Sequence, residues 1–239
     1  MRATLSIVVA FAALALSAPL AAESTDVDLE SSDGVTLKAT YSSPGRPGPA
    51  MLLIHQCNMD RTSWSGITAE LVDAGIHVLT LDLRGFGDSG GEGISGGFPT
   101  FLEKSAGDAD MALEYLVSQS GVDRTRVGVG GASCGGMILA DLAARTEVKA
   151  LMLLSSPPSE TAVKNMAATP GLAVFAAATE DDPVTVGVAD ALRGAVKGSE
   201  HPHSTAKIFA GTEHGLPMFE KNGSLEPELL DWLKTELSN

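Results

Sequence analysis

Apolar and polar residues alternate near the start of the chain but cluster into continuous runs further on. Residues 27–31 and 35–41 alternate on either side of Asp33-Gly34, a turn signal, so they predict an antiparallel hairpin. The continuous apolar runs are residues 50–55, 76–82, 127–129, 149–154, 172–177 and 206–210. Such runs are typical of strands buried on both faces of a sheet, which is then largely parallel.

Amphipathic segments lie between these runs and predict helices. Apolar residues recur at helical spacing at Ala109, Ala112, Leu113 and Leu116, at Trp64, Ile67 and Leu71, and at Leu230, Leu233 and Leu237. This alternation predicts a three-layer α/β domain with a mostly parallel central sheet and an N-terminal hairpin. Only residues 155–171 separate two successive runs, which leaves room for a short helix near 160–165 and none for a cap domain.

The first residues have the pattern of a secretory signal. Arg2 precedes the apolar stretch 7–16, and the small residues of 17–22 suit signal peptidase, with cleavage expected after Ala22. We therefore expect a signal peptide at 1–22 and a single domain at 23–239, secreted or periplasmic. Because no second segment reaches spanning length, we expect no stable membrane association after cleavage.

Composition narrows the class of partner. The chain of 239 residues has a formal net charge of −14 and no basic run, which argues against nucleic acid. Its 2 cysteines cannot make a zinc finger or a disulfide-dense scaffold. A small-molecule substrate remains the expected partner.

Candidate chemistry begins at residues 131–135, Gly-Ala-Ser-Cys-Gly, which fit the G-x-S-x-G pattern between a predicted strand and a predicted helix. A serine on so tight a turn presents its hydroxyl at the sheet edge beside a helix N-terminus, so Ser133 is the expected nucleophile. Two cofactor interpretations fail here. A dinucleotide fingerprint needs Gly where Ser133 stands, and no Gly-Lys-Ser/Thr triplet for a P-loop occurs in the chain. We expect no cofactor.

A nucleophilic serine needs a base and an orienting carboxylate, expected after later strands in the order Ser, acid, His. The run 172–177 leads into three carboxylates, of which Asp182 is the first choice, Asp181 the second and Glu180 the third. His214 follows the last run and is the expected base.

The remaining histidines suggest less chemistry. His77 lies inside an apolar run and is expected to pack in the core. His201 and His203 flank Pro202 in a polar loop, where His-x-His can bind a metal but is more often solvated. We therefore expect no metal site.

Taken together, the chain resembles the α/β-hydrolase family over almost its whole length after residue 22. The stretches that carry the resemblance are 52–56, 82–89, 131–136, 180–183 and 214–215. The short outline without a cap is similar to the dienelactone hydrolase and small serine esterase branch. The resemblance implies that His55, Asp82, Arg84 and Asp88 support the fold and take no part in catalysis.

The chain departs from that branch at two positions. Dienelactone hydrolases use a cysteine nucleophile, whereas Ser133 stands at the elbow here. The usual His-Gly after the first central strand is His55-Gln56, which changes the loop expected to help bind an oxyanion.

The expected oxyanion donors are the backbone N–H of Cys134 and that of Gln56 or Cys57. Two donors about 3 Å from one oxygen bring their backbones within disulfide range, so Cys57 and Cys134 are expected to be bridged in an oxidising compartment.

The leading functional prediction is an exported serine hydrolase that cleaves an ester-type acyl bond through an acyl-enzyme. A lactonase of dienelactone hydrolase type and an acyl-peptide hydrolase are alternatives within the enzymes. A binding protein on a hydrolase scaffold is the alternative outside them.

Overall fold

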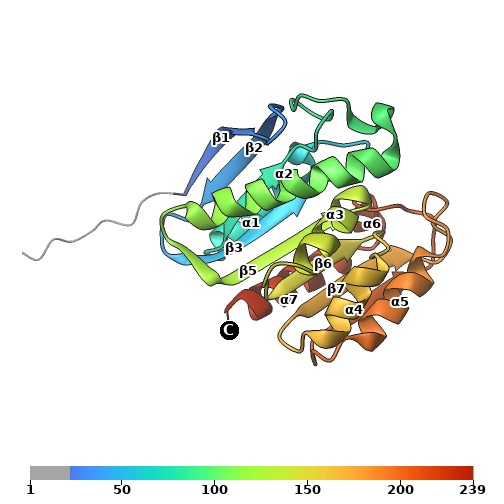
Figure 1. The fold of residues 1–239 in the computed structure, drawn as a ribbon. Coiled ribbons are helices and arrows are strands. Elements are labelled where there is room, and N and C mark those ends of the chain that lie inside the picture. Colours follow the sequence, from blue (N-terminus) through green and yellow to red (C-terminus); the bar gives the residue numbers. More distant parts are fainter. Residues whose placement is uncertain (1–21, 239) are drawn as a thin grey trace, which may run out of the picture.

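The computed structural model describes residues 22–238, in which strands and helices alternate along the chain (Figure 1). The strands are β1 (Glu23–Glu30), β2 (Thr36–Ser43), β3 (Gly48–Ile54), β4 (His77–Leu81), β5 (Val122–Ala132), β6 (Ala150–Leu154), β7 (Ala173–Thr179) and β8 (Thr205–Phe209). The α-helices are α1 (Ser65–Asp73), α2 (Phe98–Ser118), α3 (Cys134–Ala143), α4 (Glu160–Ala168), α5 (Val188–Gly198), α6 (Met218–Lys221) and α7 (Leu225–Ser238). Two short 3₁₀ helices, η1 (Arg61–Trp64) and η2 (Gly93–Gly96), precede α1 and α2.

The eight strands form one sheet in the order β1-β2-β4-β3-β5-β6-β7-β8. β1 pairs antiparallel with β2, and β2 antiparallel with β4, whereas all later pairs are parallel. The predicted N-terminal hairpin and the mostly parallel sheet are thus confirmed.

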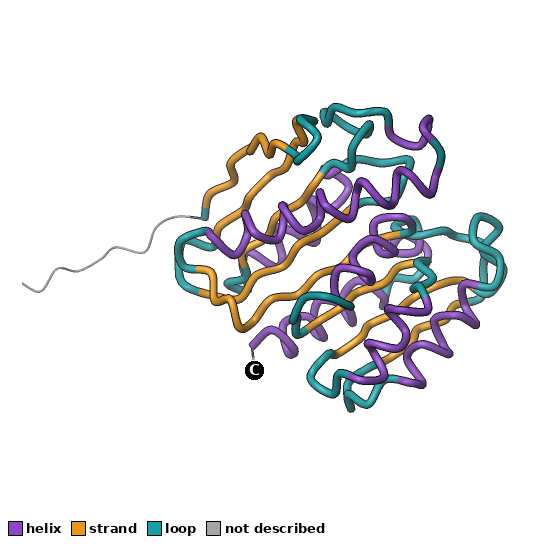
Figure 2. Tube along the Cα trace, in the orientation of Figure 1, coloured by secondary structure: helices purple, strands orange, loops and turns teal. Residues whose placement is uncertain are grey.

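Helices cover both faces of the sheet and make three layers (Figure 2). One core cluster contains the apolar residues of α2, α3, α4 and α5, and the other contains those of α1 and α7. Strands β3, β4, β6 and β7 are buried along their whole length, as continuous apolar runs predict. The three-layer α/β expectation is therefore confirmed.

β5 is longer than its apolar run suggested. The sequence pattern marked only 127–129, but the strand begins at Val122. Its first half is polar and largely open to solvent, and a register shift lies between its pairs Gly48–Val122 and Ala50–Val127. An apolar run identifies the buried half of such a strand and misses the rest.

The parallel strands bring their carboxyl ends to one edge of the sheet, where loops gather on the right of Figure 2. The segments that follow β5, β7 and β8 at this edge carry Ser133, Asp182 and His214. Between β6 and β7 the chain forms only α4, so no cap domain is inserted there. The β6–β7 connection therefore adds no cap over these three residues.

The proposed signal peptide at 1–22 lies outside the described residues, apart from Ala22. Across residues 22–238, every helix is too short or too polar to span a bilayer.

Candidate active site

Ser133 occupies a sharp turn between β5 and α3. Its backbone has φ 49° and ψ −124°, a conformation that residues other than glycine rarely adopt. Its N–H donates to Leu154 O at 2.8 Å. A Cβ on Gly131 would lie 2.6 Å from the carbonyl carbon of Gly135, and one on Gly135 would lie 2.5 Å from His55 O. The two flanking glycines are therefore required for the close approach that presents Ser133 at the first turn of α3.

His214 and Asp182 form a hydrogen-bonded pair at the same edge. His214 Nδ1 lies 2.7 Å from Asp182 Oδ2. Asp182 Oδ1 accepts from the backbone N–H groups of Val184 at 2.9 Å and Thr185 at 3.0 Å. Burial raises the pKa of Asp182, but the hydrogen bonds from His214 and the two amides outweigh it and hold that pKa below its ordinary value. An ionised Asp182 therefore fixes the Nδ1–H tautomer of His214.

The other two candidate acids point elsewhere. Glu180 is exposed and forms an ion pair with Arg193, and Asp181 is exposed as well. Of the three carboxylates in this loop, the structure brings only Asp182 to His214.

The second ring nitrogen of His214 is the most informative atom of the site. The His214 side chain is only 10% exposed, and its Nε2 is buried without a hydrogen-bond partner anywhere in residues 22–238. Ser133 and His214 are accordingly not hydrogen-bonded to each other in this structure. Catalytic hydrogen bonds are often long in substrate-free enzymes and tighten when substrate binds. Since Nδ1 is the protonated nitrogen, Nε2 is a free acceptor suited to a proton-transfer role.

Three side chains that the sequence analysis did not single out as positioning residues hold the loop of His214. Gln56 Oε1 accepts from Leu216 N at 2.9 Å, and Ser155 Oγ accepts from Gly215 N at 2.9 Å. Thr179 Oγ1 donates to Glu213 O at 2.9 Å. The backbone on both sides of His214 is thus fixed by contacts from three different strand ends.

The backbone of Ser155 has an unusual conformation that the sequence does not indicate. It follows β6 directly and has φ 49°, the same unusual value as Ser133. Its N–H donates to Ala177 O at 2.8 Å, which continues the sheet while the side chain reaches Gly215. Such strain persists where surrounding contacts over-determine it, as at functional sites.

The loop after β3 lies against the first turn of α3. Cys57 and Cys134 form a disulfide with a Cα–Cα distance of 5.9 Å, as the sequence analysis expected. Gln56 O accepts from the N–H groups of Asn58 at 2.8 Å and Met59 at 3.0 Å, and its side-chain Nε2 donates to Asn58 Oδ1 at 2.8 Å. The loop is therefore tightly turned as well as covalently tied to the residue after Ser133.

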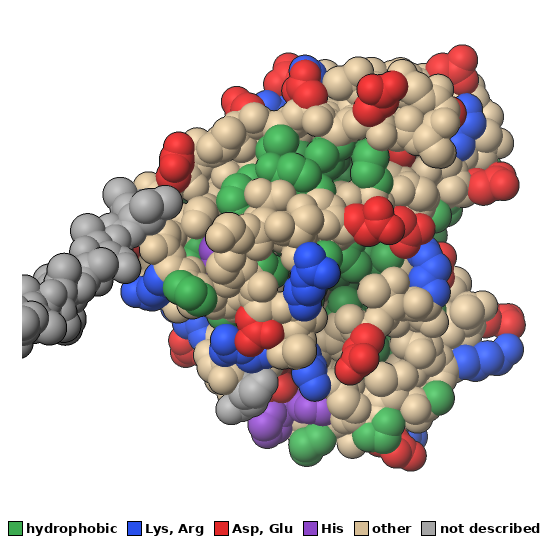
Figure 3. All heavy atoms as spheres, turned by 60° about the vertical axis from the view of Figure 1, so that its left-hand side comes forward, with side chains coloured by type: hydrophobic (Ala, Val, Ile, Leu, Met, Phe, Trp, Pro, Cys, Tyr) green, Lys and Arg blue, Asp and Glu red, His purple; other side chains and the backbone are tan. Residues whose placement is uncertain are grey.

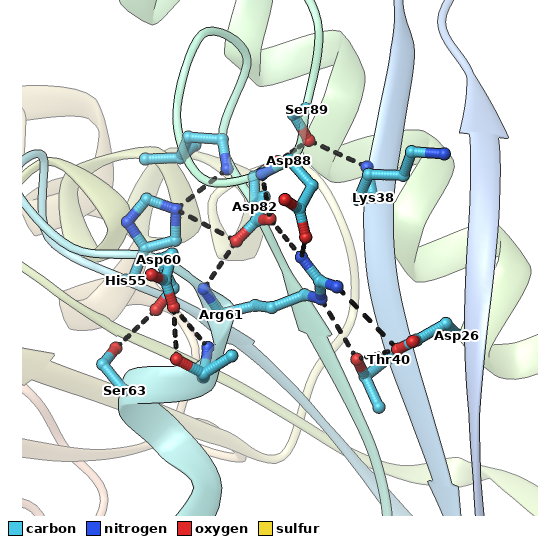
Figure 4. Close-up of polar contacts among 12 residues, drawn as sticks. Asp26, Lys38, Thr40, His55, Asp60, Arg61, Ser63, Asp82, Asp88 and Ser89 are labelled. Atoms are coloured by element: carbon cyan, nitrogen blue, oxygen red, sulfur yellow. Dashed lines mark hydrogen bonds and ion pairs between the residues drawn. The ribbon is translucent and has the colours of Figure 1, made fainter.

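His55 lies under this loop (Figure 4). Its Nε2 accepts from Leu83 N at 3.0 Å, and its Nδ1 lies 2.8 Å from Gln56 O, which it can only approach as a donor. Burial lowers the pKa of His55, so the ring is neutral near pH 7. His55 is thus a structural support that links β3 to the segment after β4.

The charged residues near His55 form hydrogen bonds and ion pairs that hold the surrounding loops together. Asp82 is fully buried and accepts from the backbone N–H of Arg61 at 2.6 Å and from Asp88 N at 2.9 Å, and it forms an ion pair with the Arg61 guanidinium (Figure 4). Arg61 also binds Asp88 at 2.9 Å. Arg84 makes two hydrogen bonds of 2.7 Å to Asp108.

A hollow lined mainly by apolar residues lies between α2, α3 and the segment after β6. Its volume is about 370 Å³, and its lining residues come from α2, α3 and the segment after β6: Leu102, Ala106, Met137, Ile138, Asp141, Pro157, Pro158 and Ser159. Met137 belongs to the first turn of α3, where its N–H donates to Ser133 O at 3.1 Å. Met137 thus joins the hollow to the segment that carries Ser133, but neither Ser133 nor His214 lines it.

Comparison with known proteins identifies the fold family. Residues 49–216 match the family model described as the alpha/beta hydrolase fold. An uncharacterized protein of Mycobacterium tuberculosis is 33% identical over 132 residues, which are 54% of this chain and 44% of that protein. The match thus spans less than half of the length of that curated relative.

Solved structures share the fold at low sequence identity. An esterase from Pyrococcus furiosus superposes with a TM-score of 0.72 at 16% identity, covering 90% of this chain and 94% of that one. An alpha/beta hydrolase from Penicillium sp. sh18 gives 0.73 at 16% identity, covering 91% and 100%. With the strand–turn–helix at Ser133 and the match over residues 49–216, this chain belongs to the alpha/beta hydrolase fold family.

Proposed function

We propose that the protein is an exported serine hydrolase that cleaves the ester-type acyl bond of a small substrate through an acyl-enzyme. The observation that carries the proposal is the Asp182–His214 pair of 2.7 Å, whose buried Nε2 is left without a partner at the edge where Ser133 sits. The structural similarity to esterases supports the reaction class.

In this mechanism Ser133 attacks the substrate carbonyl while His214 Nε2 takes the hydroxyl proton. The resulting imidazolium is stabilised by the ionised Asp182. Burial raises the pKa of Asp182, but the hydrogen bonds from His214 and two backbone amides lower it by more, so Asp182 stays ionised. The imidazolium then protonates the leaving alcohol. Water then attacks the acyl-enzyme while His214 Nε2 takes its proton. The imidazolium returns that proton to the Ser133 oxygen as the carboxylic acid leaves.

The negative charge that develops on the carbonyl oxygen needs fixed donors. The backbone N–H of Cys134 is the first amide of α3, so it has no acceptor within the helix and points toward incoming charge. The second donor comes from the loop after β3, at Gln56 or Cys57, which the disulfide holds close to Cys134. One such donor is typically worth about 3–4 kcal/mol of barrier.

The substrate we expect has a short acyl chain. The hollow that includes Met137, four residues after Ser133, has a volume of about 370 Å³, and the β6–β7 connection adds no cap that would enclose a longer chain. The apolar Leu102, Met137 and Ile138 on its wall favour an alkyl group over a charged one.

Export is part of the proposal. The disulfide between Cys57 and Cys134 is of the kind that persists in oxidising compartments, and the pattern of residues 1–22 is that of a signal peptide. Sequencing the N-terminus of the protein recovered from culture medium or periplasm tests it. A start at Glu23 supports export, whereas an intact Met1 in the cytosol contradicts it.

Labelling with a fluorophosphonate probe tests the hydrolase mechanism. We expect one label per chain, mapped by peptide mass spectrometry to Ser133, and no label in Ser133→Ala or His214→Ala. A folded wild-type protein that takes no label would instead favour a binding protein on a hydrolase scaffold. Rates on p-nitrophenyl esters, lactones and peptide amides then separate esterase from lactonase and acyl-peptide hydrolase.

A further inference from the structure

A second cluster of titratable side chains lies away from the Ser133 edge, where α7 meets the loop between α5 and β8. His201 and His203 are in that loop, and Glu236 is in the last turns of α7. One ligand atom from each residue lies within 4.8 Å of the other two. Histidine side chains gather at one place on the surface low in Figure 3.

The three residues face one another closely. His203 Nδ1 lies 2.7 Å from Glu236 Oε1, and His201 Nε2 lies 3.7 Å from Glu236 Oε2. The Glu236 side chain is only 7% exposed, whereas that of His203 is 55% exposed. A nearly buried carboxylate thus faces two imidazoles, while solvent still reaches the cluster from the side of His203.

The loop is held in place by contacts that do not involve the three side chains. Trp232, one turn before Glu236 on α7, donates from Nε1 to His203 O at 2.8 Å. Ser204 N donates to His201 O at 3.0 Å and closes a turn, and Ser204 Oγ accepts from Val174 N at 3.0 Å. The two imidazoles are therefore presented to α7 by a preorganised backbone.

We propose that His201, His203 and Glu236 bind one divalent transition metal ion of the Zn²⁺ class, which fastens α7 to the loop before β8. Imidazole nitrogen with one carboxylate is a donor set that favours Zn²⁺ over Mg²⁺ or Ca²⁺. Zinc–ligand bonds of about 2.0–2.2 Å put neighbouring donors of a tetrahedral site about 3.3 Å apart. The three ligand atoms lie within 4.8 Å of one another, so side-chain adjustments of about 1–2 Å bring them to that spacing.

Binding changes two contacts in a defined way. The ion takes the place of the His203–Glu236 hydrogen bond, with one bond from each residue to the metal, so the His203 proton moves from Nδ1 to the solvent-facing Nε2. His201 Nδ1 accepts from His203 N at 3.3 Å, so ligation through Nε2 moves the proton to Nδ1 and releases that contact. The solvent-facing side of His203 leaves the fourth position to water.

The polar sequence around Pro202 alone favours a solvated His-x-His. Two histidines around Pro202 make an incomplete site, and the third ligand lies 33 residues from His203 along the chain. Only the packing of α7 against the loop brings the carboxylate to the pair. The site involves neither Ser133 nor His214 and does not depend on the proposed hydrolase function.

The test is metal binding by the purified, tag-free protein after treatment with a chelator. Titration calorimetry with Zn²⁺ is expected to give one equivalent with a micromolar or tighter Kd, and Co²⁺ is expected to give visible absorption bands of a low-coordinate site. At Zn²⁺ concentrations about 100 times Kd, the thermal midpoint should rise by about 5–10 °C.

Variants locate the site. His203→Gln, at a largely exposed position, and Glu236→Gln are each expected to weaken Zn²⁺ binding at least tenfold and to abolish the thermal shift. Asp231→Asn removes an exposed carboxylate from the same helix and should bind like the wild type. His214→Ala should also bind normally. Absence of saturable binding, or binding lost in His214→Ala and kept in His203→Gln, would overturn the proposal.

Discussion

The side-chain oxygen of Gln56 accepts a hydrogen bond of 2.9 Å from the backbone N–H of Leu216, two residues beyond His214. Gln56 is 3% exposed and stands at the start of the loop that we expect to bind the oxyanion. This one contact therefore ties the proposed oxyanion loop to the loop of the proposed base, across 160 residues of chain.

Gln56→Ala is expected to lower kcat about 10- to 100-fold with a smaller change in KM, because a base misplaced by about 1 Å loses that much rate. The matched control is Asn58→Ala, which removes the partner of Gln56 Nε2 but keeps the contact to Leu216. Steady-state kinetics on a short-chain p-nitrophenyl ester measure both. Equal losses in the two variants would show that the loop as a whole matters and that the Leu216 contact does not.

Asp182→Asn is expected to lower kcat by about 10³–10⁴-fold, since an amide cannot hold the Nδ1–H tautomer of His214 or stabilise its charged form. Asp181→Asn is the control, because Asp181 is exposed in the same loop. It should retain nearly full activity. If Asp181→Asn lost more kcat than Asp182→Asn, the orienting role would belong to Asp181.

Removing the disulfide with the double variant Cys57→Ala, Cys134→Ala is expected to destabilise the fold. The bridge joins positions 77 residues apart, and the chain-entropy model gives such a loop about 4–5 kcal/mol. The thermal midpoint should fall by about 10–15 °C, and reduced wild-type protein should show a similar fall. If reduction leaves the midpoint unchanged, the bridge does not stabilise the native state.

Stability is expected to decline as pH falls below about 6.5, the ordinary value for histidine. Burial lowers the pKa values of both His55 and His77, so each stays neutral in the folded protein and takes up a proton only on unfolding. At a pH between the lowered pKa of each histidine in the folded protein and its ordinary value in the unfolded chain, the unfolded state binds more protons. Each histidine then favours unfolding by up to about 1.4 kcal/mol per pH unit. Urea midpoints at pH 7.5, 6.5 and 5.5 measure the decline, and His77→Gln should make it shallower.

Local patterns predicted much of the fold. The apolar runs located the parallel strands, because burial on both faces of a sheet leaves a continuous apolar run. The turn at Asp33-Gly34 and the alternation around it located the hairpin, because burial on one face leaves every second residue apolar. The first half of β5 was missed because its residues are polar and solvent-accessible.

Candidate site residues were predictable where a turn or strand end marks them. The glycines around Ser133 and the strand before Asp182 are local features, and the pairing of Cys57 with Cys134 followed from the expected approach of two loops. Ser155 and Thr179 also stand at strand ends, but the sequence does not mark their contacts. Their contacts to the His214 loop join side chains to backbone atoms 60 and 34 residues away, which no short motif encodes.

The role of Ser133 as the nucleophile is tested by measuring kcat for the mature protein and for Ser133→Ala on a C2–C12 series of p-nitrophenyl esters. We expect the wild type to prefer the shortest acyl chains and Ser133→Ala to lose at least 10³-fold in kcat while its far-UV circular dichroism and thermal midpoint stay close to the wild type. A folded Ser133→Ala protein that hydrolyses these esters at the wild-type rate would contradict the assignment of Ser133 as the nucleophile.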